Sequence, residues 1–236
     1  MRTSRQIYEE YWQMSQSHLA YMDKYNKAFP NEILECVDTI LKKGKKLLDV
    51  GCGSGALMEF TESKFDEIHG CDISETALQK AKKRGMRAIC VNLNEAPLPY
   101  ENDSFDGITC LEVIEHVLDP LWLLRDLQRA LRPKGQLILT TPNIRYFRNL
   151  TKLIFKGEFP HTTTDRFVWG GGHLHYFTKK DLAFLLGEAG FEKIEFHINQ
   201  KQFERSWKRR LLLRITGKPT FEEWFCGGII AEAFKG

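Results

Sequence analysis

The feature that most constrains the fold is a short apolar run that ends in three glycines at alternate positions, Gly51, Gly53 and Gly55. The run at residues 47–50 predicts a buried strand, and the residues after the glycines can open a helix. A strand, a tight turn and a helix in this order place backbone N–H groups and a helix N-terminus against a ligand. Glycine is needed because a Cβ would block the turn or the approach of the ligand. Asp49 directs a carboxylate into the same space, so we expect a nucleotide-type binding site.

Short apolar segments alternate with segments of helical pattern after this turn. The expected strands cover residues 67–73, 87–91, 105–111, 136–141, 191–198 and 228–234, and the expected helices cover residues 75–84, 119–131 and 178–189. Ser74 and Thr178 are predicted N-caps, Asp181 reinforces the second cap, and residues 133–135 predict a turn before the strand at 136–141. The alternation indicates a parallel sheet covered on both faces. We therefore expect a doubly wound, Rossmann-like α/β fold with seven strands, the last antiparallel.

The two flanks of this core have less regular patterns. Residues 4–42 are predicted to be helical, with a break at Pro30 before a second helix from about Glu32. Their many aromatic residues are Tyr8, Tyr11, Trp12, Tyr21 and Tyr25. They favour a helix packed on the sheet edge, or alternatively a cap over a cofactor pocket. Within a single domain we expect a helical cap (1–43), a cofactor-binding core (44–142), an acceptor lid (143–177) and the C-terminal half of the sheet (178–236).

Composition excludes several classes of protein. Lys and Arg number 34 against 31 Asp and Glu, which does not call for a nucleic-acid partner. The six cysteines include no C-x-x-C pair, so we expect reduced, mostly buried thiols rather than disulfides or a zinc site. The N-terminus has no apolar signal segment, and no run reaches transmembrane length. We therefore expect a cytoplasmic monomer or homodimer that binds no nucleic acid.

A glycine turn of this kind serves two classes of cofactor. Dinucleotide-binding proteins use G-x-G-x-x-G, whereas the spacing of Gly51, Gly53 and Gly55 is one residue shorter. Asp72 ends the next strand, where both classes place an acid that accepts hydrogen bonds from ribose hydroxyls. Ser74 already supplies the cap of the helix that follows, which favours a ligand-binding role for Asp72.

A series of motifs resembles the class I S-adenosylmethionine-dependent methyltransferases. The strand and turn LLDVGCGSG at residues 47–55 are similar to the first motif of that family. The match continues with GCDIS (70–74), LPY (98–100), DSFD (103–106), EVIEHV (112–117) and ALRPKGQL (130–137). The resemblance covers about residues 45–142 and implies an enzyme that uses S-adenosylmethionine.

The same resemblance implies roles for individual residues. The glycine turn would pass beneath the methionine part of the cofactor, Asp49 would help to hold its amino group, and Asp72 would take the ribose. Ile73 would pack on the adenine, and Asn92 would lie beside the adenine amine. Many relatives have Asp at that position, and Asn keeps an acceptor oxygen for the amine. The expected cofactor-binding residues are Asp49, Gly51, Cys52, Gly53, Gly55, Asp72, Ile73, Asn92, Leu93 and Leu111.

Glu112, Glu115 and His116 have the spacing i, i+3 and i+4, which on a helix would place them on one face after the fourth strand. Such a set can ligate a divalent cation that polarises a hydroxyl acceptor. The spacing resembles the metal-binding element of ubiquinone-biosynthesis O-methyltransferases and of small-RNA 2′-O-methyltransferases. There a downstream histidine completes the site, and His173 or His175 would supply it here. The metal-free alternative, which we favour, makes His116 a general base or a wall of the acceptor pocket.

His173 and His175 follow three glycines and precede a helix, where a hinged loop can deliver side chains over a site. Alternate residues of an extended segment point opposite ways, so we expect only one of the two to reach the pocket. The candidate catalytic residues are therefore His116, His173 and His175. The segment 172–178 also resembles, more loosely, bacterial methyltransferases associated with methionine-biosynthesis or cell-surface glycan genes.

Two basic segments, at residues 145–156 and 205–214, lie outside these motifs. They have three open interpretations: an acceptor lid, a surface for an anionic, lipid-linked or membrane-bound substrate, and an amphipathic helix with solvated charges.

We predict methyl transfer from S-adenosylmethionine to a small-molecule or glycan-like acceptor, at oxygen. The alternatives are an NAD-dependent enzyme and an inactive methyltransferase-like binding protein.

Overall fold

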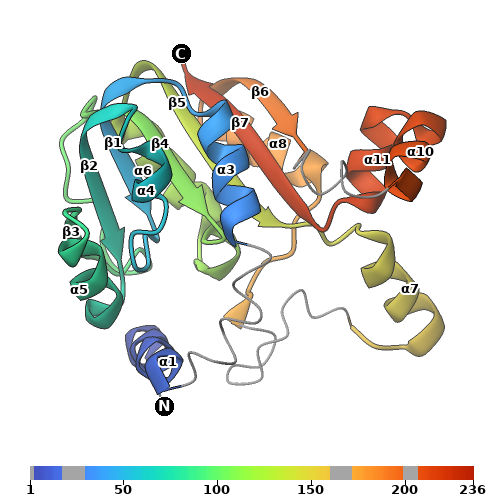
Figure 1. Ribbon diagram of the computed structural model, residues 1–236, viewed down its shortest axis with the longest axis horizontal. Coiled ribbons are helices and arrows are strands. Elements are labelled where there is room, and N and C mark those ends of the chain that lie inside the picture. The colour runs from blue at the N-terminus through green and yellow to red at the C-terminus, as the bar shows by residue number, and fades with distance from the viewer. Residues whose placement is uncertain (1–2, 18–29, 160–171, 199–206) are drawn as a thin grey trace.

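The computed structural model describes residues 3–17, 30–159, 172–198 and 207–236. They form a seven-stranded sheet with helices on both faces (Figure 1). The strands are β1 (Gly44–Val50), β2 (Phe65–Asp72), β3 (Arg87–Cys90), β4 (Phe105–Leu111), β5 (Leu131–Pro142), β6 (Phe191–His197) and β7 (Gly228–Lys235). Their order is β3-β2-β1-β4-β5-β7-β6, and β7 runs antiparallel to both of its neighbours. The expected sheet with an antiparallel last strand is confirmed.

The sheet separates two apolar cores because alternate residues of each strand point to opposite faces. The helices are α1 (Ser4–Ser17), α3 (Pro30–Ile40), α4 (Met58–Thr61), α5 (Glu75–Lys83), α6 (Pro120–Ala130), α7 (Phe147–Lys156), α8 (Lys179–Glu188), α10 (Trp207–Thr216) and α11 (Lys218–Phe225), with a 3₁₀ turn η1 (Ile114–His116). In β1, Leu47 joins the core beneath α3, α4 and α5, whereas Leu48 joins the core beneath α6 and α8. The sequence of β1 therefore needs apolar residues on both faces.

The predicted helix caps are confirmed. Ser74 Oγ accepts a hydrogen bond from Ala77 N at the start of α5. Thr178 and Asp181 form a reciprocal capping box at the start of α8. These caps fix where each helix begins relative to the strand before it, which positions the loops at the carboxyl edge of the sheet.

The predicted turn at residues 133–135 lies inside β5 instead of before it. Phe105 of β4 pairs with Leu131, and Gly107 pairs with Gln136. The residues between Leu131 and Gln136 therefore bulge out of the ladder, with Lys134 at φ 65°. The strand begins earlier than expected because Leu131 enters the sheet as soon as α6 ends.

At the N-terminus, α3 begins at Pro30 itself, two residues before the expected start at about Glu32. Proline is tolerated there because the first turn of a helix leaves its N–H groups unpaired. Tyr21, Tyr25 and much of the expected lid, residues 160–171, lie outside the described residues.

All six cysteines are free, as expected. Among the described residues, no helix is both long enough and apolar enough to span a bilayer.

Three helices project together from one end of the sheet. Helix α7 follows β5, while α10 and α11 precede β7, and Figure 1 shows all three at the right of the molecule. The ring centroids of Phe147 in α7 and Phe225 in α11 are 5.5 Å apart. The described parts of the two basic segments, residues 145–156 and 207–214, therefore belong to one projecting part of the structure, which we call the helical lobe (α7, α10 and α11).

Candidate active site

The glycine turn at the end of β1 needs glycine for both conformation and space. Gly51, Gly53 and Gly55 have φ angles of 71°, 51° and 76°, which favour glycine. A Cβ on Gly51 would lie 2.2 Å from Cγ2 of Val113, in the segment after β4. The N–H of Gly51 also donates to the carbonyl of Cys71 at 2.8 Å. The turn is thereby held against the carboxyl ends of β2 and β4.

Asp72 is the acid at the end of β2. Its Oδ2 accepts a hydrogen bond from Gly53 N and its Oδ1 accepts one from Ser74 N, both at 2.9 Å. Burial raises the pKa of Asp72, although these hydrogen bonds oppose the rise. Each carboxylate oxygen has a second lone pair, so the side chain can still accept hydrogen bonds from a diol such as ribose.

Asp49 lies beneath the turn and is buried. Thr109 Oγ1 donates a hydrogen bond to its Oδ1 at 2.8 Å. Burial raises the pKa of Asp49 to about 7, since a carboxylate in a poorly solvated site favours its neutral form. A cationic group nearby would restore the ionised form, so this residue could respond to the amino group of a cofactor.

A cavity of about 220 Å³ lies at this edge of the sheet. Six of the ten expected cofactor-binding residues line it, namely Gly51, Gly53, Asp72, Ile73, Asn92 and Leu93. The other four, Asp49, Cys52, Gly55 and Leu111, are not among the lining residues. Gly55 instead allows the turn to pack on α5, since a Cβ added at this position would lie 3.2 Å from the Cα of Ala81. Glu112 and His116 line the cavity as well.

Helix α1 supplies an aromatic wall to the cavity. Tyr8, Tyr11 and Trp12 all line it. The indole of Trp12 would lie 2.9 Å from a Cβ on Gly53. The many aromatic residues of this segment were the signal in the sequence. Helix α1 lines the cavity, which agrees with the interpretation of this segment as a cap over a cofactor pocket.

Glu9 anchors α1 to the start of α5. Its carboxylate accepts hydrogen bonds from Ser74 Oγ at 2.8 Å and Thr76 N at 3.2 Å. Burial alone would raise the pKa of Glu9, but the hydrogen bonds from Thr76 and Ser74 outweigh it and lower the pKa. The contact lies two residues beyond Asp72, so the aromatic wall is fixed beside the ribose-type site.

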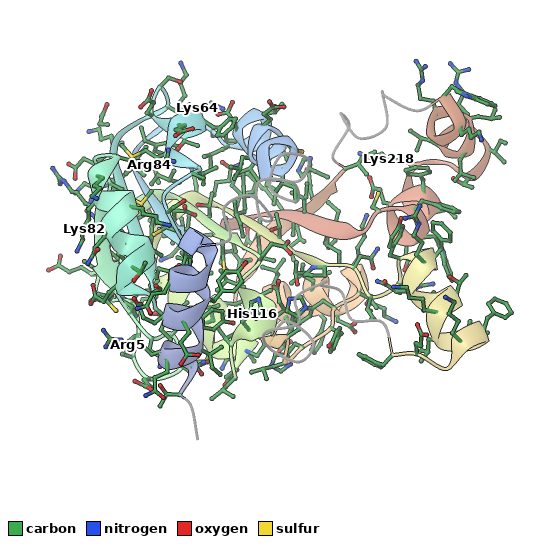
Figure 2. All side chains as sticks on the ribbon, turned by 60° about the horizontal axis from the view of Figure 1, so that its bottom comes forward. Arg5, Lys64, Lys82, Arg84, His116 and Lys218 are labelled. Carbon is green, nitrogen blue, oxygen red and sulfur yellow. The ribbon has the colours of Figure 1, made fainter. Side chains whose placement is uncertain are left out.

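Glu115, His116 and His173 form a cluster, called here the Glu–His cluster, with ligand atoms within 4.8 Å of one another. Glu115 Oε1 lies 3.9 Å from His116 Nε2 and 4.0 Å from His173 Nε2. Glu115 Oε2 accepts a hydrogen bond from Thr141 Oγ1 at 3.0 Å. Glu115 Oε1 is buried and has no hydrogen-bond partner among the residues that the structure describes. Figure 2 shows His116 beside α1, where Tyr8 meets its ring edge-on.

The electrostatics of the Glu–His cluster fit a cation. Burial raises the pKa of Glu115 well above its usual range. Burial also lowers the pKa of His116, and it lowers the pKa of His173 to about 4. His116 Nδ1 lies 3.2 Å from the Gly172 carbonyl, which can only accept, so Nδ1 carries the proton and Nε2 offers a lone pair. Neutral imidazoles and an unsatisfied carboxylate oxygen are the donor set that a divalent metal ion requires.

The structure does not bring Glu112 into this cluster. Its backbone has a φ of 55°, and its Oε1 accepts a hydrogen bond from Thr140 Oγ1 at 2.9 Å. The segment after β4 forms only the 3₁₀ turn at Ile114–His116, so Glu112 and Glu115 do not share a helical face. Glu112 instead lines the cofactor cavity.

His175 is also absent from the cluster. Its ring packs on Phe177 with centroids 6.0 Å apart, and its Nε2 is buried without a partner among the described residues. The N–H groups of Leu174 and His175 both donate to the carbonyl of Glu115. These two backbone hydrogen bonds hold the segment beside Glu115, with the His173 side chain toward the cluster. Only one of the two histidines therefore reaches the cluster, as the alternation of side chains along an extended segment predicted.

Sequence reasoning did not single out Asn94, Val113 or Val117, which also line the cavity. Asn94 Oδ1 accepts a hydrogen bond from Leu118 N at 2.8 Å and joins the loop after β3 to the loop after η1. Its only signal in the sequence was its position two residues beyond Asn92.

Comparison with known proteins places this site in a family. A family model described as a methyltransferase domain matches residues 18–195. The ubiquinone biosynthesis O-methyltransferase of Idiomarina loihiensis is 35% identical over 106 residues, covering 42% of this chain and 43% of that protein. The enzyme of the same description from Aliivibrio fischeri is 31% identical over 145 residues, covering 56% and 61%. The chain thus spans about half the length of the curated relatives it matches.

Solved structures agree on the fold. A SAM-dependent methyltransferase from Thermotoga maritima has a TM-score of 0.61 at 17% identity, covering 95% of this chain and 99% of that one. A chain from the complex of the Haloferax volcanii Trm112 methyltransferase activator with a methyltransferase has a TM-score of 0.63 at 15% identity, covering 92% and 94%. Dinucleotide-binding folds have the strand order 3-2-1-4-5-6, whereas here the antiparallel β7 lies between β5 and β6. The alternative of an NAD-dependent enzyme is therefore wrong. The chain belongs to the class I S-adenosylmethionine-dependent methyltransferases.

Proposed function

We propose that this chain transfers a methyl group from S-adenosylmethionine to a hydroxyl oxygen of a small-molecule acceptor. The names of the matched relatives support oxygen as the acceptor atom. The observation that carries the proposal is the position of His116, which lines the cavity and also belongs to the Glu–His cluster. A group that can handle the acceptor proton therefore lies at the edge of the cofactor space.

In this proposal the cavity holds the cofactor in the orientation that the family motifs imply. Asp72 accepts hydrogen bonds from the ribose, and Ile73 packs on the adenine beside Asn92. The glycine turn lies under the methionine part, and the carboxylate of Asp49 faces its ammonium group. The lining of the cavity supports four of these positions, while Asp49 acts from beneath the turn.

The reaction is an in-line displacement at the sulfonium methyl group. The acceptor oxygen forms a bond to the methyl carbon while the carbon–sulfur bond breaks, and the cofactor leaves as a neutral thioether. The site must align the two reactants and remove the hydroxyl proton. Without a metal, the unprotonated Nε2 of His116 is the group that takes this proton.

We further propose that Glu115, His116 and His173 hold a divalent cation. The cation would lower the pKa of the acceptor hydroxyl. Two imidazoles and one carboxylate suit Mn²⁺, Fe²⁺ or Zn²⁺ better than Mg²⁺, which prefers oxygen ligands. The metal set expected from the sequence was Glu112, Glu115 and His116, with His173 or His175 as a further ligand. The position of His173, 4.0 Å from Glu115 Oε1, supports it in place of Glu112. A metal-bound Nε2 cannot also accept a proton, so the two roles of His116 exclude each other.

A panel assay with S-[methyl-³H]adenosylmethionine tests the proposed function. Small phenols and polyols are offered beside the amines in which NH₂ replaces each hydroxyl. We expect tritium in the hydroxyl compounds and little in the amines. Transfer confined to the amines would contradict an oxygen acceptor, and cofactor binding without transfer to any of them would favour the inactive binding protein.

A further inference from the structure

Helix α7 has an amphipathic sequence but buries none of its residues. Phe147 and Ile154, seven residues apart, lie on one face of the helix and are 37% and 70% exposed, and Leu153 and Phe155, at the two edges of that face, are 44% and 81% exposed. A helix of a globular protein normally turns such an apolar stripe toward the core. The exposed stripe of α7 therefore has no apolar cover among the described residues.

Helix α10 has one apolar face toward the protein and a second toward solvent. Leu212 and Leu213 pack with the buried Phe221 of α11. Trp207, Leu211 and Ile215 have the spacing i, i+4 and i+8, and they are 65%, 48% and 72% exposed. The spacing places them in one outward stripe, with a tryptophan at its end.

The two helices are held in one body by α11. Arg145, just before α7, forms an ion pair with Glu223 and lies 4.5 Å above the ring of Trp224. Asn143 Nδ2 donates to the carbonyls of Glu223 and Cys226 at 2.9 Å. Both views show α7, α10 and α11 at the same end of the molecule (Figures 1 and 2). The exposed stripes therefore lie at the same end of the molecule.

This region concentrates positive charge in a chain whose net charge is only +3. Neither α7 nor α10 contains an acidic residue. The acids of α11 are already engaged, because Glu222 pairs with Lys179 and Glu223 pairs with Arg145. Within the described side chains of the two helices, no ion pair engages the basic residues Arg148, Lys152, Lys156, Lys208, Arg210 and Arg214.

We propose that the helical lobe docks on the surface of an anionic lipid bilayer. The exposed stripes of α7 and α10 would enter the boundary between headgroups and acyl chains, and the basic side chains would meet the lipid phosphates. A second copy of this chain would present the same positive charge and repel the first. A nucleic acid would leave Phe155, Ile154 and Ile215 without an apolar environment. An anionic bilayer satisfies both the charge and the apolar surface.

The lobe is connected to the candidate active site through the end of β5. Thr141 near the end of β5 donates to Glu115 of the Glu–His cluster, and Asn143 begins the connection to α7. Docking by the lobe would thus hold the carboxyl edge of the sheet near the membrane surface. An acceptor that partitions into the bilayer would then be concentrated beside the cavity.

Vesicle sedimentation tests this proposal with the full chain. Vesicles of phosphatidylcholine with phosphatidylglycerol should bind the protein, and vesicles of phosphatidylcholine alone should not. The double variant Ile154→Gln/Phe155→Gln should bind about tenfold more weakly or worse. The charge variant Lys152→Glu/Lys156→Glu should also bind about tenfold more weakly. Phe184→Gln removes an apolar ring of 65% exposure from α8 and should bind like the unmodified protein.

Two further measurements keep the result decisive. Thermal melting shows that the variants fold, and titration with S-adenosylmethionine should give unchanged affinity, which separates this proposal from the proposed function. Equal binding to both vesicle types, or none to either, would overturn the proposal. Lipid-free dimerisation that the same substitutions abolish would assign the surface to a second copy, and stronger binding to nucleic acid would overturn it as well.

Discussion

The Asp72→Ala variant is expected to bind S-adenosylmethionine between about tenfold and about a hundredfold more weakly than the unmodified protein. Hydrogen bonds to a charged group contribute about 1.5–3 kcal/mol, and the carboxylate of Asp72 lines the cavity where the ribose is proposed to lie. Isothermal titration calorimetry measures the change directly.

The control for this variant must account for the second role of Asp72. Its carboxylate also holds the N–H groups of Gly53 and Ser74, so removal loosens the glycine turn. Asp72→Asn retains an acceptor oxygen of nearly the same shape and should lose less affinity than Asp72→Ala. Asp66→Ala removes an exposed carboxylate from the same strand and should change nothing. Unchanged affinity in Asp72→Ala would remove the ribose assignment.

The second large effect is expected from the Glu–His cluster. Glu115→Gln and His173→Ala should each reduce the rate of methyl transfer by about 10²–10³-fold, in the range found for groups that handle protons at a reacting centre. Their affinity for S-adenosylmethionine should remain within about twofold, because neither residue lines the cofactor cavity. Steady-state rates and calorimetry on the same preparations separate the two quantities.

Metal dependence distinguishes the two proposed roles of the cluster. Dialysis against a chelator should abolish activity, and Mn²⁺ or Zn²⁺ should restore it better than Mg²⁺. Glu112→Gln is the matched control, because Glu112 bonds to Thr140 outside the cluster and should not affect metal affinity. Full activity in chelator, together with loss of activity in His116→Ala, would instead assign His116 as a metal-free base.

The parts of the fold that could be predicted from sequence depend on local chemistry. The bounds of β4 agree with the expected residues 105–111 because an apolar run is flanked by polar turns. The caps at Ser74 and Thr178 agree because a hydroxyl and the next helical N–H groups lie within three residues. The first residue of β5 could not be predicted from local sequence, because Leu131 joins the sheet by pairing with Phe105 of the neighbouring strand β4.

The candidate site shows the same division. Gly51, Asp72 and Asn92 could be placed at one edge because parallel strands end together. Glu112 could not be placed, because the spacing argument assumed an α-helix where the backbone adopts a φ of 55°. The contact of Glu9 with Ser74 joins residues 65 positions apart, and no local pattern encodes it.

The most direct test of the whole account is a crystal structure with S-adenosylhomocysteine and Mn²⁺, with anomalous data collected for manganese. We expect the ribose on Asp72, the adenine beside Ile73, and the cofactor sulfur facing the Glu–His cluster. The anomalous peak should lie among Glu115, His116 and His173. A cofactor bound outside the cavity, or one whose sulfur faces away from the cluster, would contradict the account; a cofactor as expected without the peak would reject the metal alone.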